Sequence, residues 1–249
     1  DSICKNLAPF IQENDHEIIK ICADYARSID KIIRFAQELS YEFEAEAEKC
    51  FKTENPIKAI MKLYRTLSDF EDCFNVNHRR MLRSAFEKGF NTSPDSAAKL
   101  LAQEVHREFL QKENDHKACP KETIDQLVAI FRMLASKDVF EVAHHMLLSR
   151  RILMMKKHVN EADEEFREDL RKQCGPDYTK SIDVLFSDVD TSLEIFKEFQ
   201  NSYQSPPSFK AIVLASQCWK FNPDETHILP PEPIRYWMDT FSNFYKQSR

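Results

Sequence analysis

The stretch Phe131–Phe140 (FRMLASKDVF), followed by Leu148–Leu153 (LSRRIL), decides the fold class of this chain. Apolar residues recur at spacings of three and four on both sides of a short polar corner, which is typical of amphipathic helices. The sequence therefore predicts two helices that meet at this corner. We expect Asp138 to cap the second helix, and Val139 and Phe140 to pack against neighbouring helices.

Two adjacent arginines, Arg150 and Arg151, belong to the second of these helices. Neighbouring side chains on a helix point about 100° apart, so at most one of the two can lie at the boundary of the apolar core. We expect both to be solvated or to pair with acidic neighbours in a helical bundle, and direct contact with a partner protein is the alternative.

The composition of the 249-residue chain favours helices and disfavours several functions. It has only two glycines, so hairpin-rich folds and Rossmann or P-loop chemistry are disfavoured. The net charge of −6 disfavours nucleic acid as a partner. The chain has no apolar run of membrane-spanning length and no signal peptide, and because it starts at Asp1 we expect a fragment. Seven widely spaced cysteines without a C-x-x-C pair indicate a reducing cytosolic or nuclear compartment.

Prolines divide the chain into helical segments. Asn55-Pro56 and Ser93-Pro94 are typical of a helix N-cap followed by proline at the first helical position. Cys119-Pro120 opens another helix after a polar linker, and Gly175-Pro176 is expected to end one helix and start the next. Between these points the apolar spacing predicts a succession of antiparallel helices joined by short turns.

The pattern changes near the C-terminus. Ser205–Pro207 breaks the last long helix, and Ala211–Ala215 (AIVLA) is a β-branched run that predicts a strand. Thr226–Leu229 is a second, weaker strand candidate, and Pro230–Pro233 leads into a terminal aromatic helix. A chain that is helical for most of its length and then begins a sheet indicates a second domain that has been cut short.

Several short motifs accompany the opening stretch in a fixed order. They include Leu82–Asn91 (LRSAFEKGFN), Ser93–Ala102, Leu170–Thr179 (LRKQCGPDYT), Leu185–Val189 and Val213–Trp219. Together with the Lys-Asp-Val-Phe corner they resemble the cullin homology region, collinearly from about residue 55 to 245. Ser149, Gln217 and Lys220 depart from the alanine, glycine and proline that the family prefers, so the chain resembles a divergent cullin.

The resemblance implies a mostly α fragment with three parts. Residues 1–92 would be the last helices of the third cullin repeat, although residues 1–54 carry no motif and join it by helical pattern alone. Residues 93–205 would form the cullin four-helix bundle. Residues 206–249 would begin the α/β part of the cullin homology domain, with a short strand and a helix.

The same resemblance implies a non-catalytic scaffold of a cullin-RING E3 ubiquitin ligase. A RING-box protein is expected to bind through the C-terminal α/β region, and a substrate adaptor through N-terminal repeats outside this sequence. We expect no catalytic, cofactor-binding or metal-binding residue, and neither nucleic acid nor membrane as a partner. Because strand edges recruit other strands, the predicted partner interface is the strand and its surroundings: Phe209, Ala211, Ile212, Val213, Leu214 and Trp219.

Three alternatives remain at this stage. A helical-repeat tethering module unrelated to ubiquitin has the same periodicity, and the anaphase-promoting complex contains a related cullin-like subunit. A metal-binding bundle would need Glu-x-x-His pairs, which occur at Glu13–His16 and Glu141–His144. Glu13 lies in a polar run, and His144 is followed by His145, which cannot face the same site from a regular helix, so we disfavour a metal centre.

Overall fold

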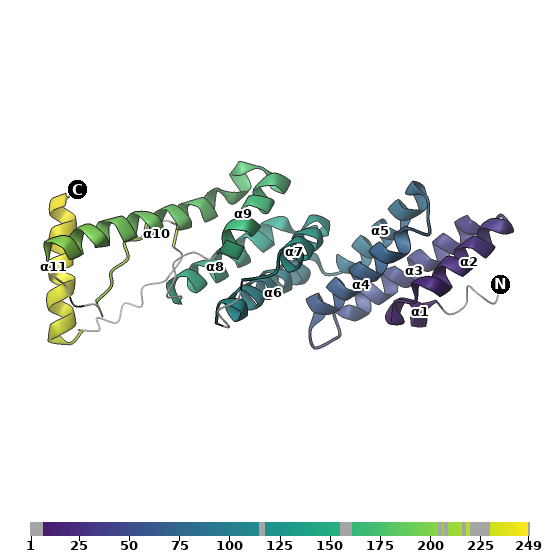
Figure 1. Cartoon of the computed structure of the whole chain (residues 1–249), viewed down its shortest axis with the longest axis horizontal. Helices are drawn as coiled ribbons and strands as arrows, with labels where there is room; N and C mark the ends of the chain where they lie inside the picture. Colours follow the sequence, from purple (N-terminus) through teal and green to yellow (C-terminus); the bar gives the residue numbers. More distant parts are fainter. Residues whose placement is uncertain are drawn as a thin grey trace. The chain divides into compact units, whose positions relative to one another are not determined.

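The computed structural model describes residues 7–114, 118–154, 161–203, 206, 209–215, 218–219 and 230–248. These residues form a mostly α fold, as predicted (Figure 1). The helices are α1 (Ala8–Glu13), α2 (His16–Ser28), α3 (Ile32–Cys50), α4 (Pro56–Glu71), α5 (Val76–Phe90), α6 (Pro94–Asn114), α7 (Lys121–Met133), α8 (Lys137–Met154), α9 (Glu161–Cys174), α10 (Pro176–Ser202) and α11 (Glu232–Ser248). In the part of the chain so described, none of these helices has the length and apolar character that crossing a membrane requires.

The proline-marked helix starts are confirmed. Helices α4, α6 and α10 begin at Pro56, Pro94 and Pro176, and α7 begins at Lys121, directly after Pro120. Proline lacks a backbone N–H, but the first N–H groups of a helix have no intrahelical acceptor, so this position costs no hydrogen bond.

The chain divides into two compact units, Asp1–His144 and His145–Arg249, with the division inside α8. In the first unit α3 packs most extensively against α5. Gly89 of α5 permits this close approach, because a Cβ atom there would lie 2.3 Å from the carbonyl oxygen of Glu44. Here the rare glycine is needed for helix packing and not for a turn.

The corner between α7 and α8 lies in the first unit and is held by the side chain of Asn91. Its Nδ2 donates to the carbonyl of Met133 at 2.8 Å, and its Oδ1 accepts from the N–H of Ala135 at 2.8 Å. Phe140 is fully buried, with its ring centroid 5.0 Å from that of Phe131. The predicted packing of Phe140 is therefore confirmed.

The remaining expectations for this corner need correction. Val139 is only half-buried, and Asp138 is exposed in the first turn of α8, one residue inside the helix. It is therefore not the cap of that helix. Its negative charge lies instead beside the positive end of the helix macrodipole, where a carboxylate is favourable.

The two arginines of the opening stretch have different environments. Arg150 is exposed, whereas Arg151 is fully buried and pairs with Asp163 of α9, whose side chain is 2% exposed. Arg151 Nε donates to Asp163 Oδ2 at 3.2 Å, and Nη2 donates to Oδ1. Pairing with an acidic neighbour was among the expectations, and it tethers α8 to α9.

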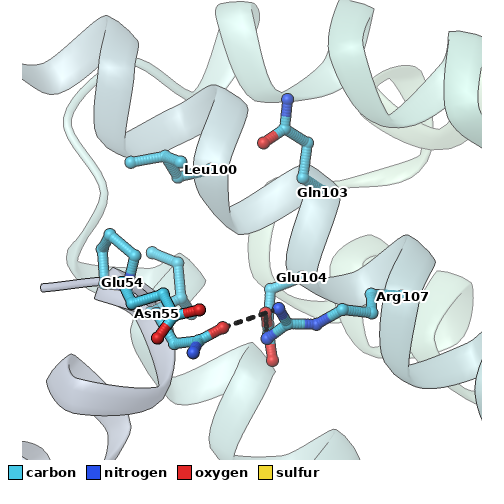
Figure 2. Close-up of a pocket in the computed structure, with 8 residues that line it drawn as sticks. Glu54, Asn55, Leu100, Gln103, Glu104 and Arg107 are labelled. Atoms are coloured by element: carbon cyan, nitrogen blue, oxygen red, sulfur yellow. Dashed lines mark hydrogen bonds and ion pairs between the residues drawn. The ribbon is translucent and has the colours of Figure 1, made fainter.

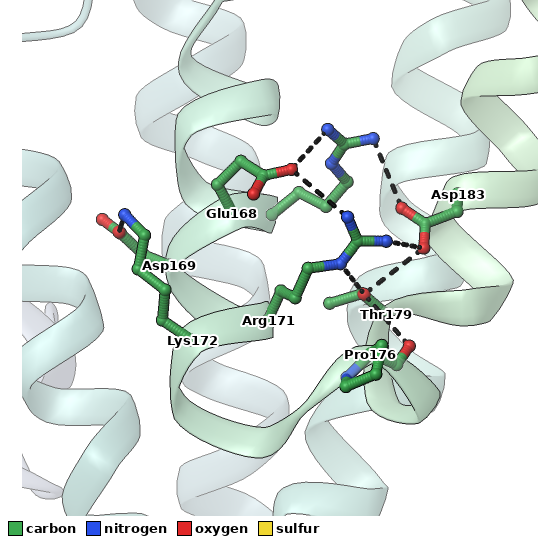
Figure 3. A network of polar contacts seen from close by, with 8 residues as sticks. Glu168, Asp169, Arg171, Lys172, Pro176, Thr179 and Asp183 are labelled. Carbon is green, nitrogen blue, oxygen red and sulfur yellow. Dashed lines mark hydrogen bonds and ion pairs between the residues drawn. The ribbon is translucent and has the colours of Figure 1, made fainter.

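Polar contacts also join α9 to α10 in the second unit (Figure 3). Arg171 donates to Asp183 Oδ2 at 2.7 Å and to Thr179 Oγ1 at 3.3 Å. Between the two helices Gly175 has a φ of 90°, a left-handed value that suits glycine. These contacts fix the start of α10, the helix that carries the site described below.

The strand predicted at Ala211–Ala215 is not formed as a strand in the structure. No strand occurs among the described residues, and the backbone of Val213 bonds to a serine side chain on α10 where a strand would bond to a second strand. The weaker candidate at Thr226–Leu229 lies outside the described residues. The predicted terminal helix is present as α11.

Candidate protein-interaction site

The second half of α10 packs with α11 around a group of apolar side chains, here called the aromatic cluster. Phe199 of α10 lies at its centre, with its ring centroid 5.1 Å from that of Phe241 at an interplanar angle of 84°. This edge-to-face arrangement is favourable for aromatic rings. The other members are Ile195, Phe196, Phe209, Ala211, Val213, Trp237, Phe244 and Tyr245.

Residues 209–215, here called the edge segment, lie beside α10 (Figure 1). Phe209, Ala211 and Val213 pack against the aromatic cluster. Ile212 and Leu214, which lie between and after them, are half-buried and are not members of the cluster. Side chains that alternate in this way are typical of an extended backbone.

Two side chains of α10 hold the edge segment by its backbone. Ser192 Oγ donates to the carbonyl of Val213 at 2.6 Å and accepts from the N–H of the same residue at 2.9 Å. Asp188 Oδ2 accepts from the N–H of Ala215 at 2.8 Å and from the indole N–H of Trp219 at 2.8 Å. Helix α10 thus provides the bonds that a neighbouring strand would provide.

The spacing of these bonds supports an extended conformation. Ser192 and Asp188 are separated by four helical residues, which span about 6 Å along α10. Val213 and Ala215 are separated by two residues, which span about 6.6 Å when extended. The two lengths agree, and the residue order shows that the segment runs antiparallel to α10.

The opposite edge of this segment bonds to none of the residues that the structure describes. In an extended chain, backbone groups of successive residues point to opposite sides, so those of Ile212 and Leu214 point away from α10. Within the described residues, nothing hydrogen-bonds to the N–H or C=O of Ile212 or Leu214. The N–H groups of Cys218 and Trp219 both bond to the carbonyl of Ala215, so a turn ends the segment there.

The six residues predicted as a partner interface therefore lie together but in different roles. Phe209, Ala211 and Val213 belong to the aromatic cluster. Ile212 and Leu214 are half-buried, and their backbone groups bond to none of the described residues. Trp219 is 4% exposed and bonds to Asp188 of α10. Their assignment as an interface stays a prediction.

Sequence reasoning did not identify the residues of α10 that hold the segment. Ser192 is 3% exposed and lies within the apolar stripe that includes Val189 and Ile195. A small hydroxyl residue at a core position was the available signal, because such a group needs a hydrogen-bond partner when buried. Asp188 was noticed only as part of a family motif.

A cavity of about 260 Å³ lies between the start of α4 and α6 in the first unit (Figure 2). Arg107 donates to Asn55 Oδ1 at 2.9 Å and also pairs with Glu104. Lys58 Nζ lies 4.0 Å from Glu104 and 2.8 Å from Glu108. The charged groups here engage one another across the helices, which is an arrangement that supports packing of α4 against α6.

Neither Glu-x-x-His pair belongs to a described group of side chains that could hold a metal ion. Glu13 is exposed, and His16 Nε2 lies 3.6 Å from Cys73 Sγ. His144 and His145 are both buried, and His144 stacks on Phe140 with centroids 5.3 Å apart. Over the described ranges, no three His, Cys, Asp or Glu side chains are grouped so as to hold a metal ion.

Comparison with known proteins identifies a family for most of the chain. A family model described as the cullin alpha solenoid domain matches residues 1–195. Cullin-4A of Homo sapiens is 27% identical over 235 residues, which cover 86% of this chain and 30% of that protein. Cullin-4 of Schizosaccharomyces pombe is 26% identical over 267 aligned residues, covering 98% of this chain and 35% of that protein. The chain therefore spans about a third of the length of these relatives.

Proposed function

The chain belongs to the cullin family, and from this premise we propose that it is a non-catalytic scaffold segment of a cullin-RING ubiquitin ligase. The observation that carries the proposal is the family match over residues 1–195, joined to collinear relatives that cover most of the chain. The segment links a stalk that carries the substrate adaptor to a C-terminal module that carries the RING-box protein. Packed helices suit this task, since transfer of ubiquitin needs a fixed gap between donor and substrate.

Within this scaffold we assign three parts, which retain the boundaries expected from the sequence. Residues 1–92 end a solenoid repeat, residues 93–205 form the four-helix bundle, and residues 206–249 begin the α/β part. We place the protein in the cytosol or nucleus. The substrate adaptor binds outside this sequence.

The RING-box protein is proposed to bind at the edge segment. A strand from that protein would add to the open edge beside Ile212 and Leu214, because unpaired backbone groups in an extended segment are a template for another strand. Support comes from the lack of any described hydrogen-bond partner on this side. The segment packs in the aromatic cluster, which holds its backbone in place for a strand that binds.

Hydrogen–deuterium exchange of the protein, alone and mixed with a RING-box protein, tests this proposal. We expect peptides covering residues 209–214 to exchange more slowly in the mixture, while peptides from α4 are unchanged. In a companion assay, the protein alone should not discharge ubiquitin from a loaded conjugating enzyme, and addition of the RING-box protein should start the discharge. No complex, or protection confined to other regions, would overturn the proposed site.

A further inference from the structure

We propose that Asn91 is a positioning residue that fixes where α8 begins relative to α5. Its side chain joins the end of α5 to the corner between α7 and α8. It therefore links the two parts that we assign as the end of the solenoid repeat and the four-helix bundle. The inference deepens the proposed scaffold function and rests on it for its consequence, but its structural half concerns the chain alone.

The side-chain amide of Asn91 bonds to both sides of this junction. Its Nδ2 donates to the carbonyl of Glu87 on its own helix and to the carbonyl of Met133, each at 2.8 Å. Its Oδ1 accepts from the N–H of Ala135 at 2.8 Å. All three bonds agree with one orientation of the amide, because only its nitrogen donates and only its oxygen accepts. The side chain is thus held by α5 while it holds the corner.

The backbone of the corner presents a matching pair of groups. Leu134, which follows α7, is 1% exposed and has a φ of −69° and a ψ of 130°, an extended conformation. Around an extended residue, the preceding carbonyl and the following N–H point to the same side. Met133 and Ala135 therefore offer one acceptor and one donor together. Asn91 binds backbone atoms, whose positions follow the path of the chain itself.

A lysine ties this corner to the first turn of α8. Lys137 Nζ donates to the carbonyl of Leu134 at 2.7 Å and to that of Arg132 at 3.2 Å. The same ammonium group lies 5.6 Å from the ring centroid of Phe131. A cation at the C-terminal end of a helix is favourable, since the last carbonyls have no intrahelical donor. Because the end of α7 and the start of α8 are joined in this way, a bond to the corner also positions α8.

Other polar contacts between the same two parts are weaker constraints. Ser136 Oγ donates to Asp95 Oδ1 of α6 at 2.7 Å, in an exposed bond. Arg65 Nη2 of α4 donates to Gln126 Oε1 of α7 at 2.6 Å, and the arginine side chain is 57% exposed. Long exposed side chains keep many rotamers and permit sliding, whereas the amide of Asn91 is short and bonded on both sides. We therefore expect loss of Asn91 to release the corner while these contacts remain.

Distances between spin labels, measured by pulsed electron spin resonance, test the inference on the chain alone. Labels carried by unnatural amino acids at Ser84 of α5 and Val142 of α8, both exposed, lie on either side of the corner. We expect one narrow distance distribution for the parent chain. Asn91→Ala should widen it by about twofold or more, because both bonds from α5 to the corner are lost. Labels at Tyr41 and Ser84, both within the repeat, should give the same distribution in parent and variant.

Two further variants separate positioning from stability. Thr92→Ala removes a bond to Glu48 at 3.2 Å and one to the carbonyl of Gly89 at 2.9 Å, neither of which reaches the corner. It should leave the distribution across the corner unchanged, even where it lowers the midpoint of thermal unfolding as much as Asn91→Ala does. Asn91→Asp keeps an oxygen for the N–H of Ala135 and should widen the distribution less than Asn91→Ala. An unchanged distribution in both Asn91 variants, or equal widening by Thr92→Ala, overturns the inference.

Discharge of ubiquitin separates this inference from the proposed function. With the RING-box protein present, Asn91→Ala should discharge ubiquitin to free lysine at the rate of the parent chain, since a free acceptor needs no fixed gap. Slower discharge by the variant would show that Asn91 acts on the partner site, and it would overturn the positioning role. If the parent chain itself starts no discharge, the proposed function fails, while widening in Asn91→Ala still supports the inference.

Discussion

Replacing Asp163 by alanine is expected to destabilise the unit His145–Arg249 by about 3–5 kcal/mol. The expectation follows from the burial of its ion pair, in which the side chains of Arg151 and Asp163 are 0% and 2% exposed. Removing the carboxylate takes this counterion from a fully buried guanidinium, so Asp163 no longer offsets the desolvation of that charge.

The size of this effect is large compared with the stability of a typical domain, which is about 5–15 kcal/mol. Urea unfolding followed by tryptophan fluorescence is a suitable assay, because both tryptophans, Trp219 and Trp237, lie in this unit. With a slope of about 1–3 kcal/mol per molar urea, the midpoint should fall by roughly 2 M.

Two further variants make the comparison specific. Asp169→Ala removes a carboxylate from the same helix, but its partner Lys172 is 68% exposed, so the midpoint should hardly move. The double variant Arg151→Met with Asp163→Leu should recover much of the loss, since apolar residues of similar volume often replace a buried pair at little cost. Equal effects of Asp163→Ala and Asp169→Ala would refute the reasoning.

Three other changes have expected outcomes in unfolding measurements. Gly89→Ala should lower the free energy of unfolding, followed by circular dichroism, by about 1–3 kcal/mol, because its Cβ would lie 2.3 Å from a carbonyl oxygen of α3. Ser84→Ala, on the exposed side of α5, should leave that free energy unchanged. Gly175→Ala should cost about 1–2 kcal/mol although nothing lies within 4 Å, because its φ of 90° strains an L-residue; an unchanged midpoint would contradict this. Burial, aided by the charge of Glu46, raises the pKa of the Cys50 thiol from 9.0 to about 11. The folded state thus favours the neutral thiol, so the free energy of unfolding should fall as pH rises from 9 towards 11. Cys50→Ala should make this fall with pH less steep. An equally steep fall in the variant and the parent protein would contradict the assignment.

The features that sequence predicted well are set by local chemistry. Proline at Pro56, Pro94 and Pro176 fixes helix starts because its constraint acts on its own backbone. Burial of Phe140 follows from helical periodicity, which places it on the apolar side of α8.

The features that the sequence does not reveal depend on which helices and segments pack against each other. The partner of Arg151 could not be chosen among the many acidic residues of α9 until the helices were packed. The run Ala211–Ala215 has strand-like composition, but a strand also needs a neighbour, and α10 supplies Ser192 and Asp188 in that place. Composition predicts an extended segment, but the packing of the folded chain decides which groups its backbone bonds to.

The affinity of the RING-box protein for two proline variants tests the central claim most directly. If backbone groups alternate as in an extended chain, Ile212→Pro removes an N–H on the side away from α10 and places the proline ring in the path of a partner strand, whereas Ala211→Pro removes an N–H on the side of α10. Isothermal titration should show a loss of about tenfold or more for Ile212→Pro and little change for Ala211→Pro, with tryptophan fluorescence confirming that both variants are folded. Full affinity of a folded Ile212→Pro variant would contradict the claim that this edge binds the RING-box protein.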